Sequence, residues 1–142
     1  MTPNTSVAVN YLFTMQAQTT PPVALGNGPH GQRLIMGVTG GTFTGPKLNG
    51  SIAESPGGEW ATLCADGSMR ADVRLLLETD DGATILMTYL GVVKAEGGEL
   101  DIRTSPLFET GDERYAWLNR IQAVGYGKAI DGGVAYDVYE LI

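Results

Sequence analysis

The sequence predicts an all-β fold, and three observations lead to that prediction. Short runs of alternating apolar and polar residues recur along the 142-residue chain, as expected of strands that bury one face. Its 20 glycines are spread between these runs, where they can form turns. Asp66-Gly67 and Asp81-Gly82 each lie between two strand-like runs, which is the strongest short-range signal of a β-hairpin. Consecutive strands without crossover helices indicate an antiparallel barrel of about eight strands.

Most of the expected strands end at glycine or proline. The first ends at Pro21-Pro22, because proline lacks an amide donor and fixes φ. Residues 26–31 are expected to form a glycine-rich loop, and Gly40-Gly41 is expected to halt the strand that follows it. The expected strands cover residues 11–19, 33–39, 48–54, 60–65, a hairpin over 69–91 extendable to 96, 99–104, 121–126 and 134–141.

One short helix is expected over residues 112–120. Asp112 suits the N-cap, Glu113 suits the positive end of the helix dipole, and Arg120 suits the negative end. No second domain, repeat or low-complexity linker is visible, so residues 1–142 are expected to form a single barrel domain.

Composition narrows the classes of function. The formal net charge of -7 and the pI near 4.5 argue against binding to nucleic acid, which requires a basic surface. His30 is the only histidine and Cys64 the only cysteine, so we expect no metal site, no disulfide within the chain and, without a recognisable cofactor motif, no cofactor. No apolar run reaches membrane-spanning length and no signal peptide is visible, so we expect a cytoplasmic protein without membrane contact.

The hairpin over residues 69–91 has one apolar and one charged face. With a two-residue type I′ turn at Asp81-Gly82, Arg74 would lie opposite Tyr89. The charged face would then combine Arg70, Asp72 and Arg74 with Met87 and Tyr89. A β-bulge beside the turn would shift one strand and change this pairing.

Several segments in order resemble the family of unknown function DUF3237, also called UPF0311. The resemblance covers nearly the whole chain. Its segments are 26–33, 40–46 with Gly50, 57–60, Asp66-Gly67, 72–74, 79–82, 108–111 and 115–119.

This resemblance implies a small calycin-like β-barrel that is often oligomeric, so we expect a homo-oligomer. Some members in natural-product pathways are cofactor-free cyclising enzymes, for example adding a hydroxyl group across a double bond. Many members carry an arginine where this chain has Leu63-Cys64, so a role for that arginine does not transfer here.

Four residues are the catalytic candidates. Asp72 and Glu109 are the carboxylates that could act as general acid or base. Arg74 and Tyr89 could stabilise an oxyanion or hold a substrate carboxylate. The alternative for Asp72 and Arg74 is an ion pair on the surface or at a subunit interface, which would contribute about 0–1 kcal/mol if exposed.

Five further residues are the ligand-binding candidates. Arg33 begins a strand after the glycine-rich loop, where it could neutralise an anionic ligand or tie down the loop. Phe108 and Tyr115 belong to an aromatic segment at the helix that could cover a pocket. Trp60 and Met87 complete the set as apolar contacts. The loop over 26–31 does not indicate phosphate binding, because it precedes a strand.

Two hypotheses follow from these residues. The first is a cofactor-independent enzyme that cyclises, isomerises or hydrates a small, mainly hydrophobic metabolite by carboxylate acid/base chemistry inside a small barrel pocket. The second is a non-catalytic carrier that binds such a molecule in the same barrel.

Overall fold

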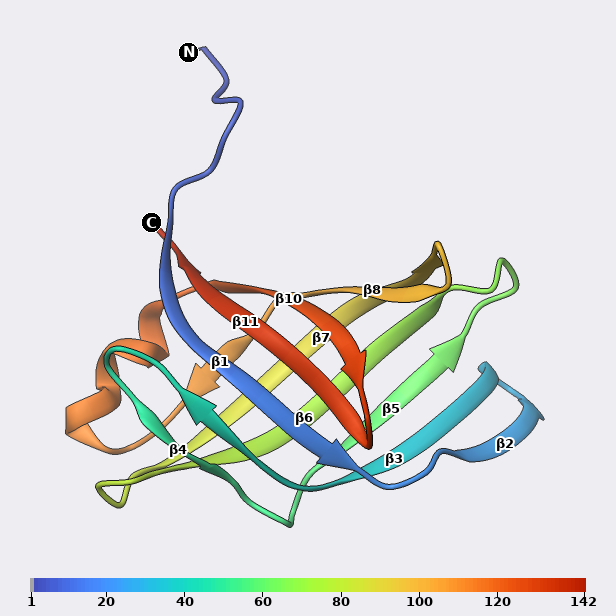
Figure 1. Cartoon of the computed structure of the whole chain (residues 1–142), viewed down its shortest axis with the longest axis horizontal. Coiled ribbons are helices and arrows are strands. Elements are labelled where there is room, and N and C mark those ends of the chain that lie inside the picture. The colour runs from blue at the N-terminus through green and yellow to red at the C-terminus, as the bar shows by residue number, and fades with distance from the viewer. Residues whose placement is uncertain (1) are drawn as a thin grey trace.

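A computed structural model describes residues 2–142, which form an antiparallel β-barrel with one short helix (Figure 1). The elements are β1 Val9–Thr19, β2 Val23–Gly28, β3 Gly31–Thr44, β4 Asn49–Ile52, β5 Gly58–Leu63, β6 Met69–Thr79, β7 Thr84–Glu96, β8 Glu99–Thr104, β9 Leu107–Glu109, the 3₁₀ helix η1 Glu113–Arg120, β10 Ala123–Ile130 and β11 Gly133–Leu141.

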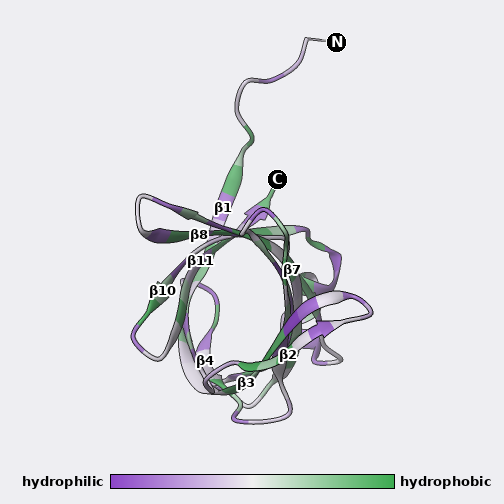
Figure 2. Cartoon of the chain, turned by 90° about the vertical axis from the view of Figure 1, so that its right-hand side faces the viewer, coloured by the Kyte–Doolittle hydropathy of each residue, from purple (hydrophilic) through white to green (hydrophobic). Residues whose placement is uncertain are grey.

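Eight strands close the barrel, as the sequence predicts. The ring runs β1-β3-β5-β6-β7-β8-β10-β11, and β11 pairs with β1 to complete it. Seen along the barrel, the strands encircle the interior (Figure 2). β4 pairs with both β3 and β6, while β2 and β9 pair with β3 and β7. Closure satisfies the backbone groups that the ring strands would otherwise expose at an edge.

Strand β3 is longer than expected, because Gly40 and Gly41 bend it instead of ending it. Both glycines have φ near +140°, which L side chains rarely adopt. A Cβ atom on Gly41 would lie 2.0 Å from the carbonyl oxygen of Gln16 on β1, so only glycine allows this close strand pairing.

The loop expected over residues 26–31 is also wrong in part. Val23–Gly28 forms β2, and β2 pairs with the first residues of β3 through a tight turn at Pro29-His30. Glycines 26 and 31 take positive φ, so the glycine content that suggested a loop serves an irregular hairpin.

The β6–β7 hairpin has a different register from the one expected. The Gly82 amide donates to the Thr79 carbonyl and the Thr79 amide donates to the Ala83 carbonyl, which makes a three-residue loop with Gly82 at positive φ. Asp72 therefore lies opposite Leu90, and Arg74 opposite Thr88.

This register places Met87 and Tyr89 on the inner face, not beside Arg74. They pair with Leu75 and Val73, and all four side chains are buried. The predicted pairing of Arg74 with Tyr89 is wrong, because the extra turn residue shifts one strand by a position and reverses its faces.

The helix begins where the sequence predicts. Asp112 caps it by accepting a hydrogen bond from the Arg114 amide at 3.0 Å. Tyr115 and Leu118 bury the inner side of η1, which lies at one end of the barrel near β4 (Figure 1).

The interior is filled by side chains at the η1 end. These residues are at most 3% exposed and form one core: Phe13, Phe43, Leu77, Ile85, Phe108 and Leu118. Phe13 packs edge-to-face on Phe43 and on Phe108, with ring centroids 5.6 and 6.0 Å apart. This end of the barrel is sealed.

Candidate functional site

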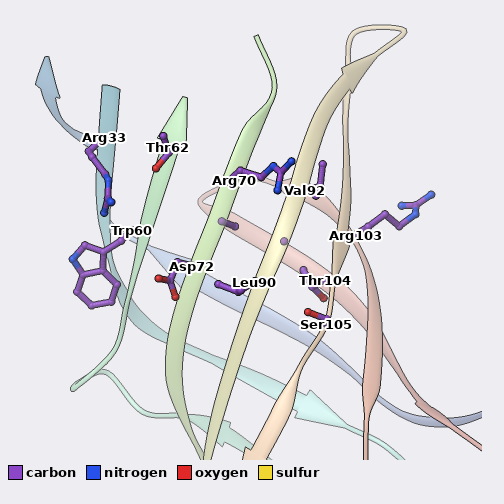
Figure 3. A pocket seen from close by; sticks show the side chains of 12 residues that line it. Arg33, Trp60, Thr62, Arg70, Asp72, Leu90, Val92, Arg103, Thr104 and Ser105 are labelled. Atoms are coloured by element: carbon purple, nitrogen blue, oxygen red, sulfur yellow. The ribbon is translucent and has the colours of Figure 1, made fainter. Parts of the chain in front are cut away.

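The charged face of the β6–β7 hairpin lies on the outside of the barrel and forms one wall of a surface depression of about 420 Å³ (Figure 3). A cross-strand row runs through this depression. Arg33 pairs with Thr62, Thr62 with Arg70, Arg70 with Val92, and Val92 with Arg103. Successive partners lie on neighbouring strands about 4.8 Å apart, so the row crosses five strands of the barrel wall.

A second set of side chains lies beside this row. Trp60, Asp72 and Leu90 come from β5, β6 and β7 and line the same depression. Trp60 is 41% exposed and Leu90 is 63% exposed. Exposed apolar groups next to arginines and one carboxylate suit a ligand that is mainly hydrophobic and carries an oxygen anion.

The three arginines of the row differ in how they are engaged. Arg103 forms an ion pair with Asp101, and its guanidinium lies 4.2 Å from the centre of the Tyr126 ring. Within residues 2–142, no ion pair within 4 Å involves Arg33 or Arg70. Arg33 and Arg70 are therefore the cations available to a ligand.

Arg33 has a further property. Its Nε atom is buried and has no hydrogen-bond partner among the described residues. A buried donor without an acceptor costs free energy, so water or a ligand oxygen is expected to satisfy it.

A second depression, of about 700 Å³, continues along β7 from the first. Asp72, Leu90 and Ser105 line both. Arg74 and Glu109 join the lining here, so the structure brings three of the four catalytic candidates to one outer groove. No ion pair within 4 Å connects Asp72, Arg74 and Glu109 in the described chain.

The groove exists because the sheet is interrupted beside β7. β8 pairs with residues 91–96 of β7 and β9 pairs with residues 86–88, and the Ser105-Pro106 segment links them. The Ser105 amide donates to the Leu90 carbonyl at 3.0 Å, which holds the link against β7. Leu107 on β9 is 50% exposed and extends the apolar wall.

Four predicted site residues do not present their side chains to this groove. Met87 and Phe108 are core residues, 1% and 3% exposed. Tyr89 lies on the inner face of β7, so only the outer side of that strand position borders the groove. The Tyr115 hydroxyl donates to a carboxylate oxygen of Asp81 at 2.8 Å, which ties η1 to the β6–β7 turn.

Two polar residues inside the barrel were not among the sequence candidates. Glu59 on β5 and Tyr136 on β11 point inward together with Tyr89. Burial raises the pKa of Glu59. The sequence offered one signal for Glu59: it is a charged residue between Gly57-Gly58 and an alternating strand. Its inward position follows only from the pairing of β5 with β6.

Residues 2–142 contain no group of three His, Cys, Asp or Glu side chains placed to hold a metal ion. No helix in that range is long and apolar enough to cross a membrane.

The fold and groove define a small closed β-barrel protein with a charged outer groove. The family model of DUF3237, a protein family of unknown function, matches residues 7–141, and the chain belongs to this family. The resemblance noted in the sequence is confirmed. A UPF0311 protein of Rhodopseudomonas palustris, RPA1785, is 26% identical over the full length of both chains.

Two other similar proteins bear on fold and function. A "beta-barrel like protein" of Acinetobacter baumannii matches with a TM-score of 0.90 and 29% identity over 100% of both chains. The hydroalkoxylation enzyme phnH of Penicillium herquei is 34% identical over 93 residues, which are 66% of this chain and 56% of that enzyme. A crystal structure of an enzyme from Penicillium herquei matches with a TM-score of 0.81 and 26% identity, over 100% of this chain and 99% of that one.

Proposed function

We propose that this protein is a cofactor-independent enzyme that rearranges a small, mainly hydrophobic metabolite by acid/base chemistry in the outer groove. Cyclisation, isomerisation and hydration fit its residues. The observation that carries the proposal is that Asp72 lines the same depression as Arg33 and Arg70, two cations without an ion-pair partner in the described chain, together with the apolar side chains of Trp60 and Leu90. The name of the Penicillium relative supports it. A cytoplasmic location is part of the proposal.

In a cyclisation, the Asp72 carboxylate accepts the proton of a substrate hydroxyl as its oxygen attacks a carbon–carbon double bond conjugated to a carbonyl group. The carbon–oxygen bond forms, and the π electrons move to the carbonyl oxygen. Arg33 and Arg70 stabilise the resulting enolate. The protonated Asp72 then returns the proton to carbon, so the reaction is an isomerisation overall.

Replacing Asp72 tests the acid/base role. We expect Asp72→Asn to lower kcat by about 10²–10⁴-fold, because the amide cannot accept the proton. Turnover can be followed by chromatography on a panel of hydroxy-enones, in which cyclisation leaves the mass unchanged and hydration adds one water. Glu78→Gln is the matched control, since Glu78 is an exposed carboxylate on the same strand and face but lies outside both depressions. Unchanged turnover in folded Asp72→Asn would contradict the proposal.

The alternative is a carrier that binds the same class of molecule without changing it. Trp60 provides a readout, because a ligand seated against its exposed indole would change its fluorescence. Saturable fluorescence changes with hydroxy-enones, together with no conversion over long incubation, would favour the carrier.

The same face is also our proposed site of self-association. Leu90, Val92 and Leu107 are 40–63% exposed and neighbour one another on β7 and β9. An exposed apolar stripe of this kind is typical of an interface, and a second copy would close the groove over its ligand. We expect a dimer or larger assembly in light scattering, and monomers after Leu90→Asp. A wild-type monomer at high concentration would exclude this interface.

A further inference from the structure

Three titratable side chains converge inside the barrel, away from the outer groove. Glu59 on β5 pairs with Val73 on β6, and Val73 pairs with Tyr89 on β7, so Glu59 and Tyr89 lie in one inward-facing row. Tyr136 approaches from β11, and its ring packs edge-to-face on that of Tyr89 with centroids 5.4 Å apart. We call Glu59, Tyr89 and Tyr136 the interior trio.

Protein groups do not satisfy the carboxyl of the trio. Within residues 2–142, no ion pair within 4 Å involves Glu59, and burial alone raises its pKa, without a cation close enough to oppose the shift. No hydrogen bond from a described side chain reaches its oxygens. Glu59 is half-buried and its oxygens are not among the buried atoms without a partner, so water or a ligand can reach them.

Burial disfavours the charged form of each member of the trio. Burial, followed by the neighbouring Tyr136, raises the pKa of Tyr89 well above its usual value. Burial raises the pKa of Tyr136 to about 12. The nearby Glu59 carboxylate adds to both shifts. At neutral pH both phenols are therefore O–H groups, and burial disfavours the charged form of Glu59.

Small residues lie next to the trio on the side away from η1. Two positions further along their strands, the inner face carries Ala61 on β5, Ala71 on β6 and Gly91 on β7. Aromatic and long aliphatic residues occupy the corresponding inner positions on the η1 side of the trio. The trio therefore lies where the inner face changes from large to small side chains.

The same end of the barrel is reached by solvent. The inner-face residues Leu34, Met36, Leu63 and Met69 are half-buried, in contrast to the sealed core at the η1 end. All six residues of β2 are exposed, and among the described strands β2 pairs with β3 alone, so the wall is incomplete here. Figure 1 shows β2 flaring from this end.

We infer that Glu59, Tyr89 and Tyr136 form a second ligand site inside the open end of the barrel, which binds the carbonyl oxygen of a small, neutral, mainly apolar molecule. Phenol O–H donors suit an acceptor oxygen, and half-buried leucine and methionine side chains suit an apolar body. An anion is disfavoured, because no cation of residues 2–142 forms an ion pair with Glu59 and Glu59 would repel an anion when ionised. This site is independent of the proposed reaction in the outer groove.

Acetophenone is a suitable probe, and the methyl groups of Met36 and Met69 report on the site. In protein labelled with [¹³C-methyl]methionine, we expect acetophenone to shift both signals saturably at millimolar concentration, with assignments from Met36→Leu and Met69→Leu. Ethylbenzene has the same body without the carbonyl group and should bind more weakly.

Variants that remove only a hydroxyl group make the test sharp. We expect Tyr136→Phe and Tyr89→Phe each to raise the acetophenone Kd about five- to tenfold while leaving ethylbenzene binding unchanged, because each retains its ring. Glu59→Gln keeps the shape and one donor and should weaken acetophenone less. Asp72→Asn, in the outer groove, should have no effect on acetophenone binding.

Three results would overturn the inference. They are absence of saturable shifts in the wild type, equal acetophenone binding by wild type and both folded tyrosine variants, and weakening by Asp72→Asn alone. The last would assign the ligand to the outer groove. Turnover of Asp72→Asn tests the proposed reaction separately, so failure of either idea is distinguishable from failure of the other.

Discussion

The two ends of the barrel interior are built from the same strands but differ in what fills them. At the η1 end, Phe13, Phe43 and Phe108 pack edge-to-face and exclude water. At the β2 end, alanine and glycine line the wall beyond Glu59 and two tyrosines. The difference indicates that close packing at the η1 end stabilises the fold, whereas the polar groups at the β2 end reduce its stability.

Polar contacts between the β6–β7 turn and η1 also hold the sealed end. We call the residues that form them, Thr79, Asp81, Arg114 and Tyr115, the polar lock. Asp81 in the β6–β7 turn accepts hydrogen bonds from the Thr79 hydroxyl at 2.6 Å and the Tyr115 hydroxyl at 2.8 Å. Arg114 donates to the Asp81 carbonyl at 2.8 Å and pairs with Asp112, the N-cap. These contacts hold η1 across the end of the barrel, and no matching lock is present around β2 in the described chain.

The largest predicted effect compares the same substitution at the two ends. Leu77→Ala, in the sealed core, should lower the free energy of unfolding by about 3 kcal/mol or more, because the close-packed core cannot fill the cavity. Leu63→Ala, on the half-buried open end, should cost about 1 kcal/mol, since solvent already reaches that side chain. Guanidinium unfolding measures both. Equal losses would show that the two ends are packed alike.

A smaller effect on stability is expected when Asp81 of the polar lock is replaced. Hydrogen bonds from Thr79 and then Tyr115, with the charge of Arg114, hold the pKa of Asp81 below its usual value. Its contribution to stability is therefore present above the unfolded-state pKa of about 3.9 and is lost as pH falls through the folded-state pKa.

Accordingly, Asp81→Asn should lower the Tm by a few degrees at pH 7 and have almost no effect near pH 2. Asp80→Asn is the matched control, because the neighbouring Asp80 carboxylate takes part in no side-chain hydrogen bond or ion pair of the described chain. A Tm loss that is the same at both pH values would show that the aspartate charge is not what holds the lock.

The smallest predicted effect concerns Glu59, whose contribution to stability changes with pH in the opposite direction to that of Asp81. Burial raises the pKa of Glu59, so its proton is held more tightly in the folded state. Stability is then greatest below the unfolded-state pKa and falls as pH rises through the folded-state pKa. Glu59→Gln should therefore raise the Tm by about 1–3 °C at pH 7 and leave it unchanged near pH 4.

Glu78→Gln is again the control, since that exposed carboxylate should show little change in Tm at either pH. A lower Tm for Glu59→Gln at pH 7 would mean that the carboxylate is stabilising, and the open end would then resemble the sealed end in energetic terms.

Much of the fold could be predicted from local sequence, and much of the site could not. The alternation in β1, β6 and β11 predicts strands wherever one face is buried, and Asp112 predicts the start of η1. β2 and β9 could not be predicted, because short, exposed segments have little alternation and their pairing depends on distant strands.

The β6–β7 turn shows why the site could be predicted only in part from the sequence. Asp81-Gly82 predicts a hairpin correctly, but a two-residue and a three-residue loop use the same residues there. The three-residue loop brings Asp72 beside Leu90 and moves Tyr89 inward, toward Tyr136. Sequence could identify Arg33, Arg74 and Asp72 as candidates, whereas Glu59 emerged only from the pairing of β5 with β6.

The sequence by itself determines the class of protein. Its strand periodicity, turn residues and family motifs specify a closed antiparallel barrel with one late helix, because these signals act between residues near in the chain. The tertiary structure decides which face of each strand lies inside. A one-residue shift reverses every side chain, and closure brings β5, β7 and β11 together across the interior, so both the outer groove and the interior trio depend on contacts between residues far apart in sequence.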